Sequence, residues 1–190
     1  VTKTNEDETA ETKFMFYDRG TNKNCLVKAT ATSTIAQLPC NVIVGGTCSN
    51  LVLTDGNYSF NADDAFTASD ASYTRNYNIS QNSTVCLPFA LTTDQVNAAG
   101  KLYELASYSA NELKFTRVTT TEAYKPYFFI PNAEQPFMNL GEKSVPATSI
   151  IPVTKDNITF KGTMNRTNLV STATNTYYGY LESNGTFVKI

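Results

Sequence analysis

The chain of 190 residues contains no histidine and no tryptophan. Histidine is the side chain whose ordinary pKa lies nearest neutral pH, and it dominates general acid–base catalysis and metal ligation. Its absence excludes Ser-His-Asp and Cys-His hydrolases, histidine-containing zinc sites and haem held by histidine. The remaining chemistry relies on carboxylates, lysine, tyrosine or a single thiolate. We therefore expect a protein that is not an enzyme and that uses no cofactor.

Charge is also scarce. Charged residues make up 17% of the chain and the formal net charge is −2, whereas globular proteins usually contain roughly 25% charged residues. No block of Lys and Arg is present, so we expect no binding to nucleic acid. No apolar run approaches the roughly 18 residues of a membrane span. Residues 1–13 are polar and predict a flexible lead-in typical of a mature exported chain. The expected location is outside the cytoplasm, either secreted or at the cell surface.

The four cysteines, at positions 25, 40, 48 and 86, form no Cys-x-x-Cys pair, which argues against a structural zinc site. An even number allows disulfides in three pairings. Gly45 and Gly46 predict a two-residue hairpin loop in which Ile43 faces Cys48. Cys40 then lies on the other face of the sheet, so a Cys40–Cys48 bridge is disfavoured. Other pairings and buried free thiols both stay open.

Strand signals dominate the rest of the chain. Short β-branched or apolar runs bounded by Gly, Asn, Asp or Pro predict strands at 24–30, 41–44, 48–54, 84–90, 101–108, 112–119 and 127–131. Apolar residues alternate with polar ones from Ile158 to Met164, which predicts a half-buried strand. One short helix is expected at 94–99, because Thr92 and Gln95 have capping-box spacing and Gly100 follows.

The C-terminal residues predict a hairpin. Asn184-Gly185 is the signal of a type I′ turn, and it would pair Leu181 with Val188 and Glu182 with Phe187. Strands at intervals of about 8–15 residues, with almost no helices between them, indicate an all-β fold built as an antiparallel β-sandwich or a barrel-like structure. A polar stretch near residue 78 divides the chain into an N-terminal β subdomain at 14–78 and a C-terminal β-sandwich subdomain at 79–190, which can also pack as one domain.

Six segments occur in an order that resembles a known family. They are 50–55 (NLVLTD), 65–68 (AFTA), 71–75 (ASYTR), 84–89 (TVCLPF), 102–105 (LYEL) and 125–131 (KPYFFIP). Over residues 40–190 the chain resembles a β-rich module of exported surface proteins from gut Bacteroidetes, which is often joined to leucine-rich repeats. The resemblance implies a module outside the cytoplasm that is linked to other surface modules in a longer precursor. The family's role is largely unassigned, and it brings no catalytic residues with it.

Aromatic residues supply the main candidates for ligand binding. Aromatic faces can pack on the apolar faces of sugar rings while phenol hydroxyls form hydrogen bonds. The tyrosines that could form such a surface are Tyr124, Tyr127, Tyr177, Tyr178 and Tyr180. Core packing is the competing interpretation, and we expect it for Phe89, Phe129 and Phe160.

Acidic residues supply weaker candidates. Asp63 and Asp64, with Asp55 and Asp70 nearby, could hold calcium, although an exposed acidic loop explains them as well. Paired carboxylates could hydrolyse glycosides without histidine, and the candidates are Asp63, Asp64, Asp70, Glu104 and Glu122.

These observations favour a non-enzymatic binding or adhesion module whose ligand is a glycan or a surface protein. The alternatives are a structural β spacer without a ligand and, less favoured, a carboxylate-dependent glycoside hydrolase.

Overall fold

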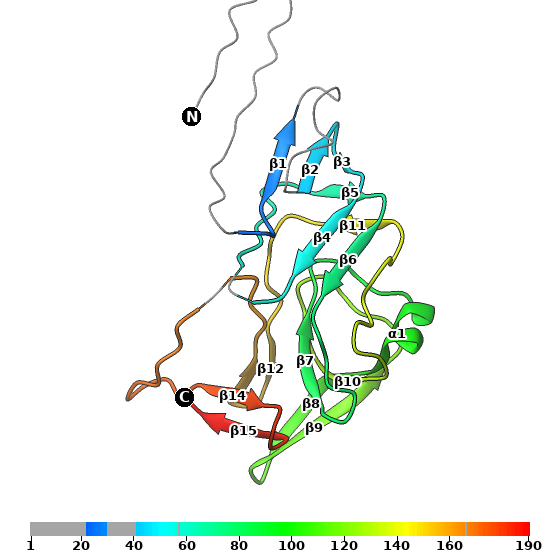
Figure 1. Ribbon diagram of the computed structural model, residues 1–190. Coiled ribbons are helices and arrows are strands. Elements are labelled where there is room, and N and C mark those ends of the chain that lie inside the picture. The colour runs from blue at the N-terminus through cyan, green and yellow to red at the C-terminus, as the bar shows by residue number, and fades with distance from the viewer. Residues whose placement is uncertain (1–21, 30–40, 57, 166) are drawn as a thin grey trace, which may run out of the picture.

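The computed structural model describes residues 22–29, 41–56, 58–165 and 167–190. This part of the chain forms β-strands and one short helix, so the all-β prediction is confirmed (Figure 1). The strands of the first half are β1 (Leu26–Ala29), β2 (Asn41–Val44), β3 (Thr47–Cys48), β4 (Leu51–Thr54), β5 (Phe66–Ala68), β6 (Ala71–Thr74) and β7 (Ser83–Cys86). Helix α1 (Thr93–Ala99) is followed by β8 (Gly100–Ser109), β9 (Glu112–Val118), β10 (Pro126–Pro131), β11 (Lys143–Val145), β12 (Val153–Lys155), β13 (Ile158–Phe160), β14 (Tyr178–Leu181) and β15 (Thr186–Lys189).

The strands form two larger sheets and three two-stranded ones. The five-stranded sheet has the order β1-β2-β3-β5-β11, and the four-stranded sheet has the order β7-β10-β8-β9. The pairs β4–β6, β12–β13 and β14–β15 stand apart from these sheets. No sheet of the described residues closes on itself into a barrel.

The prediction of purely antiparallel pairing is wrong for the N-terminal half. There β1 pairs with β2, β3 with β5 and β4 with β6 in parallel. Parallel neighbours need a long connection that returns the chain to the same end of the sheet, whereas antiparallel neighbours need only a tight turn. The chain between β4 and β6 is long enough for this and also contributes β5.

Local signals located two elements correctly. Ile43 pairs with Cys48 as predicted, and Gly45 and Gly46 both have positive φ, at 55° and 79°. Helix α1 begins after Thr92, whose side chain accepts from the Gln95 N–H while the Gln95 side chain accepts from the Thr92 N–H. This is the predicted capping box.

The predicted register of the C-terminal hairpin is wrong. Tyr180 pairs with Phe187 and Leu181 with Thr186, which leaves a four-residue turn. A type I′ turn needs positive φ at both central residues, but of Asn184 and Gly185 only Gly185 has it, at 66°. The Asn184 and Gly185 N–H groups both donate to the Leu181 carbonyl oxygen.

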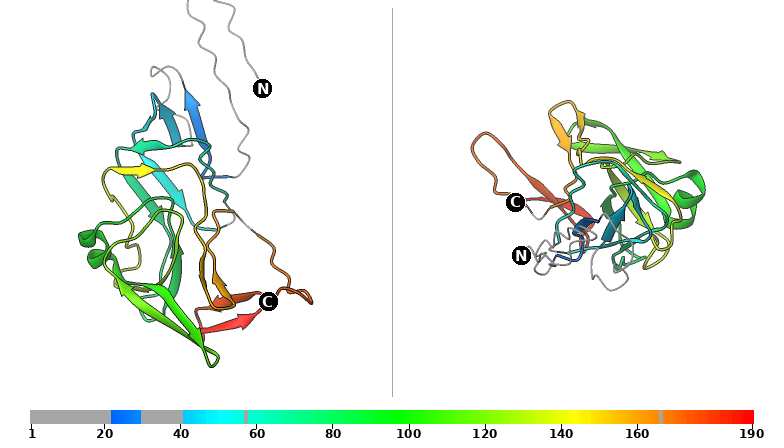
Figure 2. Two further views of the ribbon diagram at one scale, coloured as in Figure 1. Left: turned by 180° about the vertical axis from the view of Figure 1, so that it is seen from behind. Right: turned by 90° about the horizontal axis from the view of Figure 1, so that it is seen from above.

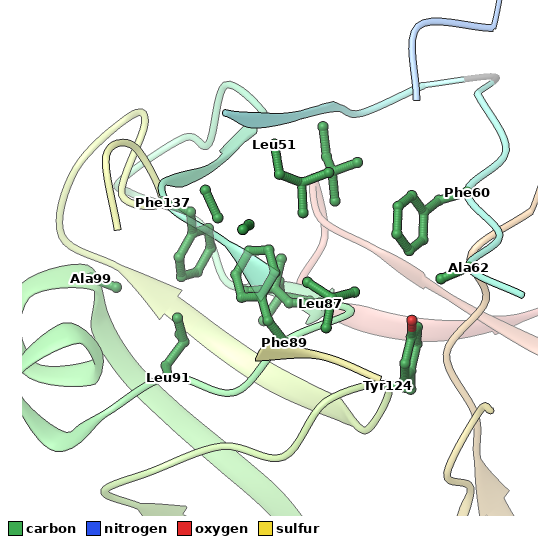
Figure 3. Close-up of a cluster of buried hydrophobic side chains, with 14 of the residues drawn as sticks. Leu51, Phe60, Ala62, Leu87, Phe89, Leu91, Ala99, Tyr124 and Phe137 are labelled. Atoms are coloured by element: carbon green, nitrogen blue, oxygen red, sulfur yellow. The ribbon is translucent and has the colours of Figure 1, made fainter. Parts of the chain in front are cut away.

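One cluster of buried side chains includes residues of both larger sheets (Figure 3). It includes Phe89 and Phe129, which are fully buried as predicted. Members come from both sides of residue 78, for example Leu51 and Leu102. The division into two subdomains stays a prediction.

The other face of the four-stranded sheet carries a row of aromatic rings. Phe160 contacts Phe115, Phe115 contacts Phe128, Phe128 contacts Tyr180, and Tyr180 contacts Phe187, with ring centroids 5.1–6.0 Å apart. All five side chains are half-buried, so Phe160 belongs to this row and not to the main core. The row attaches β13 and the β14–β15 hairpin to the sheet, at the end of the molecule opposite β1 and β2 (Figure 1 and Figure 2).

Candidate functional site

A pocket of about 240 Å³ lies beside the end of β4. Its walls come from the residues that follow β4, from β6 and from the segment after β13. The residues that line it include Tyr58, Tyr73, Asp55, Thr163, Asn165 and Thr167. The pocket therefore combines aromatic surface, one charged group and uncharged polar groups.

The wall formed by β4 is fixed by an asparagine side chain. The buried Asn24 accepts from the Thr54 N–H at 2.7 Å and donates to the Thr54 carbonyl oxygen at 2.9 Å. Its amide thus replaces the neighbouring strand that β4 lacks on this side. The next N–H, of Asp55, donates to the carbonyl oxygen of Thr74 in β6 at 2.9 Å. These bonds hold the Asp55 backbone at the edge of the pocket.

The opposite wall is a segment far away in the sequence. The Phe60 N–H donates to the Met164 carbonyl oxygen at 2.9 Å, which ties this segment to the residues after β4. The Thr163 hydroxyl accepts from the Asn165 N–H at 3.1 Å and donates to the Asn165 carbonyl oxygen at 2.6 Å. This local turn presents Thr163, Asn165 and Thr167 at the rim, where all three are exposed.

The Asp55 carboxylate is held by two groups of β6 and the residues after it. The Tyr73 hydroxyl donates to one oxygen at 3.0 Å, and the other oxygen lies 3.4 Å from Nε of Arg75. Arg75 also donates to Glu182 at 2.6 Å and to the Thr84 carbonyl oxygen at 3.1 Å, and its guanidinium carbon lies 4.8 Å from the ring centroid of Tyr77. The side chain of Asp55 is nevertheless about half exposed, at 48%, so it can accept further hydrogen bonds.

Burial keeps Tyr73 neutral. Burial raises the pKa of Tyr73 above its ordinary value, and the Asp55 carboxylate raises it further while Arg75 lowers it. Burial opposes the charge on Arg75, but the nearby carboxylates of Asp55 and Glu182 favour it, and the pKa of Arg75 is raised. Tyr73 thus remains a hydrogen-bond donor and Arg75 remains a cation over the ordinary pH range.

Cys86 also lines the pocket and carries a free thiol. Burial raises the pKa of this thiol to about 12, so it is protonated at neutral pH and does not act as a nucleophile. Cys48 is likewise a free thiol within the described residues, which answers the open question for these two cysteines. Cys40 lies outside the described residues.

Tyr124 and Tyr127 are buried, with 2% and 3% of their surfaces exposed. The Tyr124 hydroxyl donates to the Pro146 carbonyl oxygen at 2.7 Å, and the Tyr127 hydroxyl accepts from the Glu122 N–H at 2.9 Å. Figure 3 shows Tyr124 among the core side chains. Neither ring presents a face to solvent, and neither lines the pocket.

The other three candidate tyrosines lie at β14. Tyr178 is 53% exposed and Tyr177 is 37% exposed, but successive side chains of a strand point to opposite faces. Tyr180 shares the face of Tyr178 and packs against Phe128 and Phe187. The three rings therefore do not form one continuous platform, and none of them lines the pocket.

The aspartates considered for calcium are engaged separately. Asp64 pairs with Lys28, Asp63 accepts from the Asn61 side chain at 2.6 Å, and Asp70 accepts from the Gly141 N–H at 2.7 Å. Within the described ranges, no group of three or more Cys, Asp and Glu side chains is arranged to hold a metal ion.

Two of the glutamates considered for glycoside hydrolysis share a partner. Nζ of Lys125 lies 2.9 Å from a carboxylate oxygen of Glu104 and 2.7 Å from one of Glu122. Burial lowers the pKa of Lys125, but the hydrogen bonds to both glutamates outweigh this and raise it. Lys125 therefore stays charged between them, and none of the three residues lines the pocket.

Sequence reasoning did not identify the pocket. Asp55 was noted only as part of an acidic cluster, and Tyr58, Tyr73, Thr163 and Asn165 were not singled out as candidates. A weak signal existed in the turn residues after a predicted strand, Asp55-Gly56. Nothing local indicates that residues 163–165 and Thr167 return to this turn.

Comparisons add no relative: no known protein family, curated protein or solved structure matches the chain. In the part of the chain that the structure describes, no helix has the length and apolar character needed to cross a membrane.

Proposed function

We propose that the chain is a non-enzymatic binding module that acts outside the cell, with a glycan or a surface protein as its ligand. The observation that carries this proposal is the pocket beside β4. It brings two half-buried aromatic rings, Tyr58 and Tyr73, next to a fixed but accessible carboxylate and a rim of uncharged polar side chains. A concave site with apolar walls and a few oriented polar groups is the usual form of a ligand-binding site.

The acidic residues support binding over glycoside hydrolysis. Hydrolysis by carboxylates needs two of them, roughly 5–10 Å apart, on either side of the bond that is cleaved. Among the described residues that line the pocket, Asp55 is the one acid, and Arg75 and Tyr73 already hold it.

The scaffold proposed for this module is a sandwich-like pair of layers. The five-stranded and four-stranded sheets contribute to one buried cluster, and packing of two sheets over a shared core is how β-sandwiches hold their loops in place. In this view the rigid layers position the loop after β4, and the loop carries the binding residues.

The two alternative functions make different predictions. A structural spacer would bind none of the glycans or surface proteins presented to it. A carboxylate hydrolase would use Glu104 and Glu122, because both lie within hydrogen-bonding distance of one ammonium. It would release product from polysaccharides or chromogenic glycosides, and Glu104→Gln or Glu122→Gln would abolish this release.

A binding array of glycans and surface proteins tests the proposal. We expect specific binding that is weakened at least tenfold by Asp55→Asn and by Asn165→Ala. The matched control is Tyr178→Ala, which removes an exposed ring outside the pocket and should leave binding unchanged. Binding that is lost with Tyr178→Ala and kept with both pocket variants would move the site to β14. Silence across the whole array would favour the spacer.

A further inference from the structure

We infer that the pocket binds a single neutral sugar ring, a pyranose without an ionised group, as one unit of a glycan. This inference rests on the proposed binding function and names the chemical class of its ligand. Three properties of the pocket carry it: its volume, its charge and the placement of its rings.

The volume limits the ligand to a small molecule. The pocket of about 240 Å³ is smaller than the roughly 300–1,000 Å³ of sites for drug-sized ligands. One ring fits this space, whereas a folded peptide segment or several sugar rings would extend over the rim. The remaining units of a glycan would leave the pocket past the exposed Thr163, Asn165 and Thr167.

The charge favours a neutral ligand. Asp55 is the one charged side chain among the described lining residues, and its carboxylate repels an anionic sugar. A cationic sugar would approach a carboxylate that already has Arg75 at 3.4 Å, which weakens the attraction for a second cation. Neutral hydroxyl groups are not affected by this repulsion or by the competition with Arg75, because they donate hydrogen bonds to the remaining lone pairs of an accessible carboxylate.

The side chains present matching surfaces. Tyr58 and Tyr73 are half-buried, with part of each ring in the wall, and an aromatic ring packs well against the C–H face of a pyranose. The half-buried Met164 extends this apolar surface. The exposed Thr163, Asn165 and Thr167 add a hydroxyl, an amide and a second hydroxyl. Uncharged donors and acceptors of this kind pair with sugar hydroxyls in either direction.

The test is a titration of the full chain, labelled with nitrogen-15, followed through its amide resonances. The probes are the methyl glycosides of glucose, galactose and mannose, with glucuronate and glucosamine as charged analogues. We expect saturable shifts with at least one neutral glycoside, largest in residues 54–58 and 163–167. Each charged analogue should bind at least tenfold more weakly than the best neutral glycoside.

Variants locate the site. Asp55→Asn keeps the shape of the side chain but removes its charge, and should weaken binding at least tenfold because a charged acceptor makes the stronger hydrogen bond. Asn165→Ala changes an exposed rim residue and keeps the test valid if Asp55→Asn fails to fold. Tyr178→Ala is the matched control and should bind like the parent.

Each outcome bears on the inference. Equal binding of a charged analogue, or shifts centred on residues 177–189, would overturn it. The inference would also be overturned if the array identifies a protein ligand and no glycoside binds. The proposed binding function would then stand. If neither array nor titration yields a ligand, both the inference and the proposed function fall.

Discussion

Gly162 lies where the chain crosses the end of β7, next to the pocket. A Cβ atom at this position would lie 2.5 Å from Sγ and 2.7 Å from Cβ of Cys86, closer than packed atoms in protein interiors approach. The φ of Gly162 is not positive, so an alanine there is opposed by this contact and not by the backbone. We expect Gly162→Ala to lower the free energy of unfolding by about 1–3 kcal/mol, measured by urea denaturation.

Two further variants separate the contact from a general effect of the added methyl group. At Gly179 a Cβ would lie 3.2 Å from Cδ1 of Ile190, the end of an exposed side chain that can turn away, so Gly179→Ala should change stability by less than about 0.5 kcal/mol. Adding Cys86→Ala to Gly162→Ala should recover part of the lost stability, because the two residues are in contact. A Gly162→Ala variant as stable as the parent would contradict the proposed crowding.

Lys143 is a buried lysine, with 5% of its surface exposed. Its ammonium donates to the Gln95 side-chain oxygen at 2.5 Å, a neutral partner, and burial lowers its pKa below 10.5. Because a buried cation without a counter-charge costs free energy, Lys143→Met should raise the free energy of unfolding by about 1 kcal/mol at neutral pH. The Gln95 oxygen keeps its bond from the Thr92 N–H.

The pH dependence gives an independent check on Lys143. As the pH rises from the lowered folded pKa towards 10.5, the unfolded chain holds a proton that the folded chain has released. Stability contributed by this residue therefore rises with pH across that window. Lys143→Met should lack this contribution. A variant that is less stable than the parent at neutral pH would mean that the ammonium supports α1 through Gln95.

At the scale of elements, the C-terminal hairpin is tied to the body through its turn. Glu182 accepts from Arg75 at 2.6 Å and from the Ser83 hydroxyl, while Tyr180 packs on Phe128. The Glu182 side chain is 37% exposed, so solvent screens part of this ion pair. We expect Glu182→Gln to destabilise the hairpin by about 0.5–1 kcal/mol and to speed amide hydrogen exchange in residues 178–189 by a few fold.

The matched control for the hairpin is Glu142→Gln, which removes the same charge at an exposed position before β11. It should leave hydrogen exchange in β14 and β15 unchanged. If Glu182→Gln also leaves exchange there unchanged, the aromatic row alone holds the hairpin.

The elements also show which parts of the fold follow from local sequence. The β2–β3 hairpin and α1 were predicted correctly because Gly45-Gly46 and the Thr92–Gln95 capping box specify them within a few residues. The register of β14–β15 was not, because Glu182 is held by Arg75, which is 107 positions away, and no turn signal carries that information. The predicted strand at 48–54 is two strands, β3 and β4, in different sheets.

The parallel strand pairs and the pocket could not be predicted from the sequence for the same reason. The pairing of β4 with β6 depends on a long connection, and the pocket depends on residues 163–165 and Thr167 lying beside the end of β4. Hydrophobic alternation gives the face of a strand but not its partner. Asn24 illustrates this, because its polar side chain is buried in order to complete the edge of β4, a role that composition alone does not suggest.

At the scale of the whole molecule, stability and the pocket depend on the same contacts. Arg75 joins Asp55 at the pocket to Glu182 in the C-terminal hairpin. Gly162 lies against Cys86, and Cys86 lines the pocket together with Thr163, Met164, Asn165 and Thr167. Conditions that loosen these contacts should therefore open the pocket as they destabilise the fold.

High pH is such a condition, because burial raises the pKa of Tyr73, Tyr77, Tyr124 and Tyr127 above 10. Above about pH 10 the unfolded chain loses protons that these phenols keep in the folded chain. Stability is therefore constant with respect to these groups below pH 10 and falls as the pH rises beyond it. Lys125, whose pKa is also raised, changes stability in the same direction as it loses its proton, whereas Lys143 opposes the fall. We expect urea midpoints to decrease steadily above about pH 10.

Tyrosinate absorbance distinguishes this explanation from a general effect of charge. The buried phenols should ionise together with unfolding, in one cooperative step. Tyr73→Phe removes one of the buried phenols. Above pH 10 it should reduce the slope of the free energy of unfolding against pH by about one proton. The control Tyr178→Phe changes an exposed ring and should leave this slope as in the parent. A gradual ionisation of all tyrosines in a chain that stays folded would contradict the burial of Tyr73 and Tyr77, and with it the wall on which the proposed sugar ring rests.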